Sequence, residues 1–143
     1  MSATAAPENE QLVDRFIETV VNGKDLDRIE EFVTEDVSDH TPMGETHGRE
    51  AFHETTTQIG TAFPDFEVSA QDIVADGDTV AVRMIQRGTH EGPFLGYGGT
   101  GESFEIHAMS FARIEDGKIA ERWVQPDLLG LLSQVGAMKG LDA

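Results

Sequence analysis

The chain has 143 residues, the size of one ordinary domain, and 38% of them are apolar, which is enough for a folded core. Its 27 acidic and 10 basic residues give a formal net charge of −17, which argues against nucleic acid and anionic membranes as partners, because both bind basic patches. Without cysteine, a secretory signal or an apolar run that could cross a bilayer, we expect a cytoplasmic protein with no disulfide and no cysteine-ligated metal.

The first half of the chain has apolar residues at the spacing of helices. Asp25, which follows Asn22-Gly23, is a candidate N-cap for the second helix. In chain order the expected elements are a loose tail (1–7), a helix (8–22), a second helix (25–33), a short extended piece (37–41), a loop (43–48) and a third helix (about 49–63).

After Pro64-Asp65 the apolar period changes to two, which is typical of strands. The expected elements are strands over 66–74, 79–89, 102–114 and 118–125, a glycine-rich loop over 91–101 and a short helix or turn over 128–135. Helices followed by a four-strand antiparallel meander predict an α+β domain over 8–137, with the helices on one face of a curved sheet. We expect residues 138–143 to form a loose C-terminus.

The basic residues are unevenly divided, with seven arginines and only three lysines. An acid-rich, lysine-poor chain suits a salt-loaded cytoplasm, because at molar salt charges are screened over about 3 Å. We therefore hypothesise a halophilic source, with an ordinary acidic mesophilic protein as the alternative.

Strand parity groups four candidate site residues, because alternate residues of a strand share a face. Each lies among apolar neighbours, and apolar walls with a few polar groups are typical of a ligand cavity. The candidates are His107, Arg83, Trp123 and Asp127. Each also has a plainer interpretation: a core histidine for His107, a surface ion pair for Arg83, ordinary core for Trp123 and a helix N-cap for Asp127.

Sharper motifs are absent or misplaced. Residues 96–101 match the spacing of the dinucleotide motif GxGxxG, but a strand follows where that motif needs a helix. We expect instead a flexible loop over a pocket mouth, with Tyr97 as a candidate contact. His40, His47 and His53 lack the spacing of local zinc pairs, and no serine stands in a GxSxG context, so we expect neither a metal site nor a serine nucleophile.

Several short stretches together carry a family pattern. They include a D-H-x-P piece over 39–42, an F-P-D-F piece over 63–66 and a D-G-K-I-x-E-x-W piece over 116–123, with Asp127 following. Over residues 10–136 the chain resembles the SnoaL-like polyketide cyclase, or ester cyclase, family of the NTF2-like superfamily.

The resemblance implies an NTF2-like, cone-shaped α+β barrel, in which N-terminal helices pack on a curved, mostly antiparallel sheet around one deep apolar pocket. It also implies a homodimer joined through the sheets. The implied reaction closes a ring on a polyketide methyl ester by intramolecular aldol condensation, without metal or cofactor.

The resemblance also implies roles for particular residues. Asp127 matches the acid/base of the family, His107 matches a histidine in the pocket, and His40 matches a cavity-facing histidine of the D-H-x-P piece. Trp123 would form a pocket wall, and His107, His40 or Arg83 would hydrogen-bond the developing enolate oxygen.

Two functions of different class are compatible with these residues. The first is a cofactor-independent cyclase or isomerase that acts on a small apolar carbonyl compound or polyketide-like ester, with Asp127 and His107 as its catalytic residues. The second is a non-catalytic module of the same fold that binds a small molecule or lipid. A buried Asp127 beside His107 favours catalysis, and an exposed Asp127 that caps a helix favours binding.

Overall fold

A curved six-stranded sheet forms the body of the computed structural model, which describes residues 5–137. The strands lie in the order β2-β1-β6-β5-β4-β3, and all neighbours are antiparallel except β1 and β6. Their bounds are β1 Val33–Thr41, β2 Gly44–His47, β3 Glu67–Asp76, β4 Thr79–Thr89, β5 Ser103–Glu115 and β6 Lys118–Pro126.

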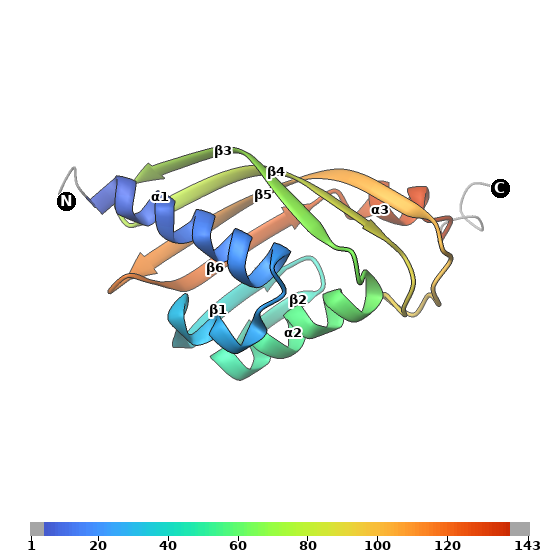
Figure 1. Cartoon of the computed structure of the whole chain (residues 1–143), viewed down its shortest axis with the longest axis horizontal. Coiled ribbons are helices and arrows are strands. Elements are labelled where there is room, and N and C mark those ends of the chain that lie inside the picture. The colour runs from blue at the N-terminus through green and yellow to red at the C-terminus, as the bar shows by residue number, and fades with distance from the viewer. Residues whose placement is uncertain (1–4, 138–143) are drawn as a thin grey trace.

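Helices cover one face of this sheet, as Figure 1 shows. The helical segments are α1 Ala5–Phe16, a π-helical segment Ile17–Asn22, a 3-10 helix Leu26–Glu31, α2 Arg49–Ala62 and α3 Leu128–Gln134. Helix α1 packs against β3 and β4, and α2 packs against β1 and β2. No helix within residues 5–137 is long and apolar enough to span a membrane.

The expected α+β architecture is confirmed, and β4 has the predicted bounds. The predicted antiparallel meander is confirmed as β3–β6, and two further strands, β1 and β2, extend the sheet beyond β6. The piece expected over 37–41 is the second half of β1, and the loop expected over 43–48 contains β2, which pairs with β1 through a tight turn at Gly44 (φ 129°).

The N-terminal helices differ from their expected form. Helix α1 begins at Ala5, so residues 5–7 belong to it rather than to a tail, whereas 1–4 and 138–143 lie outside the described residues. The segment after Phe16 continues as a π-helix, and Asp25 makes no side-chain capping bond to the 3-10 helix that follows. Asn22 anchors this segment, because its amide exchanges two hydrogen bonds of 2.8 Å with the backbone of Val68.

The inner face of the sheet, which the helices cover, takes the even-numbered residues of β4 and β5. Val80 and Val82 of β4 and Phe104 and Ile106 of β5 are buried there. The odd-numbered residues, His107 among them, point outward and are exposed or half-buried. This choice of face decides which candidate residues can reach the interior.

Candidate active site

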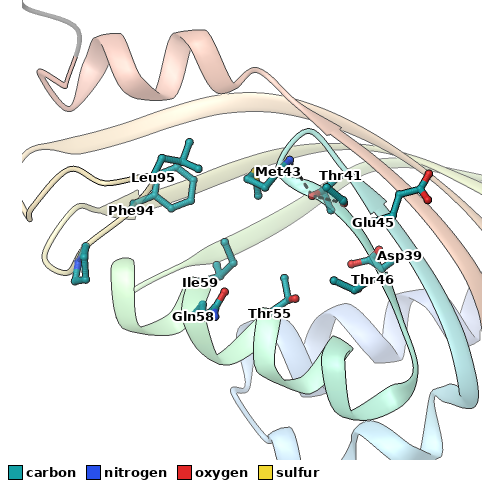
Figure 2. Close-up of a pocket in the computed structure, with 12 residues that line it drawn as sticks. Asp39, Thr41, Met43, Glu45, Thr46, Thr55, Gln58, Ile59, Phe94 and Leu95 are labelled. Atoms are coloured by element: carbon teal, nitrogen blue, oxygen red, sulfur yellow. Dashed lines mark hydrogen bonds between the residues drawn. The ribbon is translucent and has the colours of Figure 1, made fainter.

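A cleft of about 470 Å³ opens between the β1–β2 hairpin, helix α2 and the loop that follows β4. Figure 2 shows its lining: Phe94 and Leu95 of the loop lie at one end and Asp39 and Thr46 at the other, with Ile59 of α2 between them. Residues Pro93, Phe94 and Leu95 of the loop that was expected over a pocket mouth therefore lie at this cleft.

Two smaller cavities continue this cleft into the interior. The middle cavity, of about 120 Å³, shares Thr41, Met43 and Phe94 with the cleft. The inner cavity, of about 80 Å³, shares Gln86 and Arg122 with the middle cavity. The three spaces together run from the mouth to the underside of α1.

Asp39, which lines the cleft, forms an ion pair with Arg122, which lines the middle and inner cavities. Asp39 points inward because it lies two residues after buried Val37 on β1, and residues two apart on a strand share a face. The exposed fraction of Asp39 is only 2%. Arg122 Nε donates to Asp39 Oδ1 at 2.9 Å, and Nη2 donates to Oδ2 at 3.0 Å. Such a two-pronged, charge-assisted contact fixes the orientation of the carboxylate and the guanidinium.

The guanidinium of Arg122 has a second support. It lies over the ring of Phe52 in α2, with 4.7 Å between Cζ and the ring centroid. Within residues 5–137, Asp39 is the one hydrogen-bond acceptor of this guanidinium and takes two of its five N–H groups, so the remaining donors are left for a ligand in the middle or inner cavity. Arg122 is thus held in place while part of its hydrogen-bonding capacity stays free.

Gln86 is the other polar side chain shared by the middle and inner cavities. Within the described residues its amide makes one side-chain contact, a weak bond of 3.7 Å from Nε2 to the sulfur of Met84. The hydroxyls of Thr41 and Thr55 also line the middle cavity, but they already donate to backbone carbonyls. Gln86 and Arg122 are therefore the groups best able to bind a ligand's oxygen.

The structure places Asp127 at the N-terminus of α3, outside the three cavities. Its side chain is exposed, and Oδ1 accepts a hydrogen bond of 2.9 Å from the backbone N–H of Gly130. This confirms the helix N-cap interpretation. The neighbours Pro126 and Leu128 line the middle cavity, so the chain reaches the site here although the carboxylate turns away from it.

The expectation that His107 lies in the pocket is wrong. His107 is exposed on the outer face of β5, because Ile106 and Ala108 take the inward positions on either side of it. Asp127 meets it only through the backbone, where the Asp127 N–H donates to the His107 carbonyl at 3.0 Å. The two side chains do not face one another across a cavity, and their catalytic roles stay predictions.

His40 and Trp123 also lie on the outer face, which corrects their expected places in the cavity. A bulge shifts the register between β5 and β6 after Arg113, so Trp123 points outward although Ile119, on the same parity, is buried. His40 stacks on Trp123 and bonds to Glu121 and Glu45. These bonds, the one to Glu121 foremost, raise the pKa of His40 above its ordinary value.

The remaining two candidates are surface residues. Arg83 Nε donates to Asp72 Oδ2 at 2.7 Å between exposed side chains, which confirms the plainer interpretation of a surface ion pair. Tyr97 is exposed and pairs with the backbone of Phe94 in the loop, but it lines none of the three cavities. Phe94, rather than Tyr97, is the aromatic contact that the loop supplies.

Sequence reasoning missed Asp39, Arg122 and Gln86, although strand parity holds a signal for each. Asp39 stands two residues after Val37, Arg122 stands two before Val124, and Gln86 stands two after Met84. Within residues 5–137, no three His, Asp or Glu side chains are arranged to hold a metal ion. A carboxylate–guanidinium pair beside an amide can move a proton and bind an oxygen.

An α+β fold in which helices and a curved sheet enclose a cleft and two inner cavities defines the class, and comparison with known proteins gives the family. The family model described as SnoaL-like polyketide cyclase matches residues 11–135. The chain belongs to this family.

Two named relatives and a solved structure support this assignment. Aklanonic acid methyl ester cyclase DnrD of Streptomyces peucetius is 32% identical over 131 residues, which cover 87% of this chain and 88% of DnrD. DauD of Streptomyces sp. (strain C5), of the same description, is 32% identical over 87% of this chain and 80% of its own. Wild-type IdmH of Streptomyces antibioticus superposes with a TM-score of 0.79 at 31% identity, over 90% of this chain and 98% of IdmH.

Proposed function

We propose that this chain closes a ring on a polyketide-like ester by cofactor-independent intramolecular aldol condensation in its interior cavity, with Asp39 as the acid/base. Family membership and the cyclases among the relatives support the class of reaction. The observation that carries the proposal is the Asp39–Arg122 pair, in which the buried carboxylate lines the cleft and the guanidinium lines the two cavities behind it.

The reaction needs one proton acceptor and donors for oxygen. Asp39, through a lone pair that Arg122 does not use, takes a proton from the carbon next to a carbonyl. The resulting enolate attacks a second carbonyl carbon of the same molecule, a C–C bond forms, and the new alkoxide recovers the proton from Asp39. The spare N–H groups of Arg122 and the amide of Gln86 donate to the oxygens on which negative charge develops.

The experiment compares Asp39 with Asp127, the acid/base that the family resemblance implied. Asp39→Asn and Asp127→Asn are assayed for turnover of aklanonic acid methyl ester, the compound for which the relatives are named. Asp39→Asn should lower kcat by roughly 10²–10⁴-fold, because it removes the proton acceptor. Asp127→Asn should stay near the wild type, because asparagine caps a helix as well as aspartate does.

The opposite ranking would return the acid/base role to Asp127 and reject Asp39. Circular dichroism and thermal unfolding of both variants serve as the folding control.

One observation favours the second candidate, a non-catalytic binding module. Asp127 is an exposed cap and His107 lies outside the cavity, as the binding interpretation required. A binding module would show no turnover in the wild type, and Asp39→Asn would bind the ester as the wild type does. Turnover by the wild type that Asp39→Asn loses decides for the cyclase.

We also infer that two copies pair through the outer face of the sheet. Four large apolar side chains share this face on neighbouring strands, and their exposed fractions are 60% for Val74, 60% for Met109, 54% for Phe111 and 38% for Trp123. We call this set the outer apolar patch. Exposure of such contiguous apolar surface to solvent is unfavourable, so we infer that a second copy of the chain buries it.

A further inference from the structure

The inner cavity lies behind Arg122, between the first helical segment and the sheet. Phe16 and Ile17 line it from the helical side, and Met84, Ala112 and Ile119 line it from the sheet. Its volume is about 80 Å³. A water-sized group occupies about 30 Å³, so the space holds a chain of about three carbon atoms.

Two features, one of side-chain size and one of the backbone, keep this space open. Ser110 and Ala112 are small residues at successive inward positions of β5, directly below the helical segment. Opposite them the α-helix gives way to the π-helix at Ile17, which widens the turn. Interiors are otherwise closely packed, and π-helical turns occur mostly at functional sites.

The inner cavity is continuous with the proposed reaction site. Arg122 and Gln86 line both it and the middle cavity, so a carbonyl oxygen held by these two residues lies at the boundary. Among the described residues on its wall, Arg122 is the only charged one, and Asp39 already balances its charge. Apart from Arg122, the Gln86 amide and the Ser110 hydroxyl, its described lining is apolar, so an alkyl group that enters it is buried mainly against aliphatic and aromatic side chains.

We propose that the inner cavity is a subsite for a short, unbranched alkyl chain, attached to the carbonyl group whose oxygen Arg122 and Gln86 bind. The substrate class is then a keto ester that ends in an alkyl chain of about three carbons. The proposal rests on the proposed function for the carbonyl contact, but it makes a prediction about binding alone.

The experiment measures dissociation constants for a series of methyl 3-oxoalkanoates whose alkyl end grows from methyl to pentyl, by NMR titration of the full chain. In the wild type the affinity should rise about fourfold per methylene group, the value of burying one such group, up to propyl. Beyond propyl it should stop rising, because the cavity is full. An affinity that does not change with chain length overturns the proposal.

Filling the cavity gives the second arm. Ala112→Leu should bind the methyl member as the wild type does and show no gain for ethyl or propyl. Ala6→Leu, which adds the same atoms at a half-buried position of α1 that lines none of the cavities, is the matched control and should keep the full gain. An unchanged gain in Ala112→Leu would place the alkyl chain elsewhere.

If Ala112→Leu does not fold, Ile17→Val replaces it. This variant enlarges the cavity by one carbon, so the affinity should keep rising up to butyl instead of stopping at propyl. If the affinity still stops rising at propyl, the subsite is rejected. The same series on Asp39→Asn keeps the two proposals apart. Loss of turnover with an intact chain-length series supports both, and normal turnover with an intact series rejects only the role of Asp39.

Discussion

His40 and Trp123 lie face to face on the outer side of the sheet, with their rings at 10° and their centroids 5.2 Å apart. Both nitrogens of His40 are bonded, Nδ1 to Glu45 Oε1 at 2.9 Å and Nε2 to Glu121 Oε2 at 2.8 Å. A neutral imidazole has one N–H only, so donation to two carboxylates requires the protonated ring. The stack therefore places a cation on the indole of Trp123, within the outer apolar patch.

This contact should make stability depend on pH. The bonds to Glu121 and Glu45 raise the pKa of His40 above its ordinary 6.5, and the bond from His40 lowers the pKa of Glu121 below 4.5. A raised pKa stabilises the fold below 6.5, and this contribution is lost as the pH rises through the raised value. A lowered pKa stabilises the fold above 4.5, and its contribution is lost on acidification. The contact is thus complete between about pH 4.5 and 6.5.

Urea unfolding at pH 6.0 and pH 8.5 checks this. The free energy of unfolding should fall between the two pH values in the wild type and fall less in His40→Gln. His53→Gln on α2 is the control, and it should keep the wild-type difference. Equal pH differences in wild type and His40→Gln would contradict the prediction.

The Asp39–Arg122 pair should matter for stability as well as for the reaction. Arg122→Met leaves the carboxylate of Asp39 buried without its partner, and we expect a loss of about 3–5 kcal/mol in the free energy of unfolding. Replacing Asp39 by Leu in the same chain removes the stranded charge and should restore part of the loss. Arg83→Met, which breaks an exposed pair with Asp72, should cost less than about 1 kcal/mol.

Denaturant unfolding of the four proteins measures these differences. A loss for Arg122→Met no larger than that for Arg83→Met would show that the buried pair contributes little to stability.

The proposed dimer predicts the effect of a charge in the outer apolar patch. Phe111→Glu places a carboxylate at the centre of this patch, beside Trp123 on the paired strand, and should shift the protein from dimer to monomer in sedimentation velocity. Leu129→Glu, at an apolar residue on α3 that is also exposed, should leave the dimer intact. A wild-type protein that sediments as a monomer at micromolar concentration would rule the dimer out.

The net charge of −17 predicts that salt stabilises the fold. Raising KCl from 0.1 M to 1 M shortens the screening length from about 10 Å to about 3 Å, which weakens repulsion among the carboxylates. We expect Tm to rise over this range, and sucrose at equal osmolality serves as the non-ionic control. A Tm that is already maximal at 0.1 M KCl would contradict a halophilic adaptation.

Local signals explain how far the fold could be predicted. Apolar period and turn residues are properties of neighbouring positions, and they were enough for helix α2, the β3–β4 hairpin and the bounds of β4 at Thr79–Thr89. Strand β2 was taken for a loop because its four residues, Gly44–His47, carry no apolar alternation. Its partner β1 binds it through the backbone, which leaves no pattern in the side chains.

The candidate site could not be located by strand parity. Strand parity correctly grouped His107, Met109 and Phe111 on one face, but grouping does not say which face turns inward. Met109 and Phe111 belong to a patch that is exposed in the single chain. Their sequence pattern is the same as that of a cavity wall, so parity could not distinguish the two. The more uniformly apolar set on the other face of β5 is the inner one.

The sequence alone determined that this protein is an acidic α+β domain of the SnoaL-like pattern. Composition, the spacing of apolar residues and short motifs are local or additive properties of the chain, so no tertiary structure is needed to detect them. The tertiary structure alone decided the site. Asp39 and Arg122 are 83 residues apart, and they meet only because β1 pairs in parallel with β6. That pairing, together with the curvature that turns one face of the sheet toward the helices, converts two unremarkable charged residues into a buried pair at the wall of a cavity.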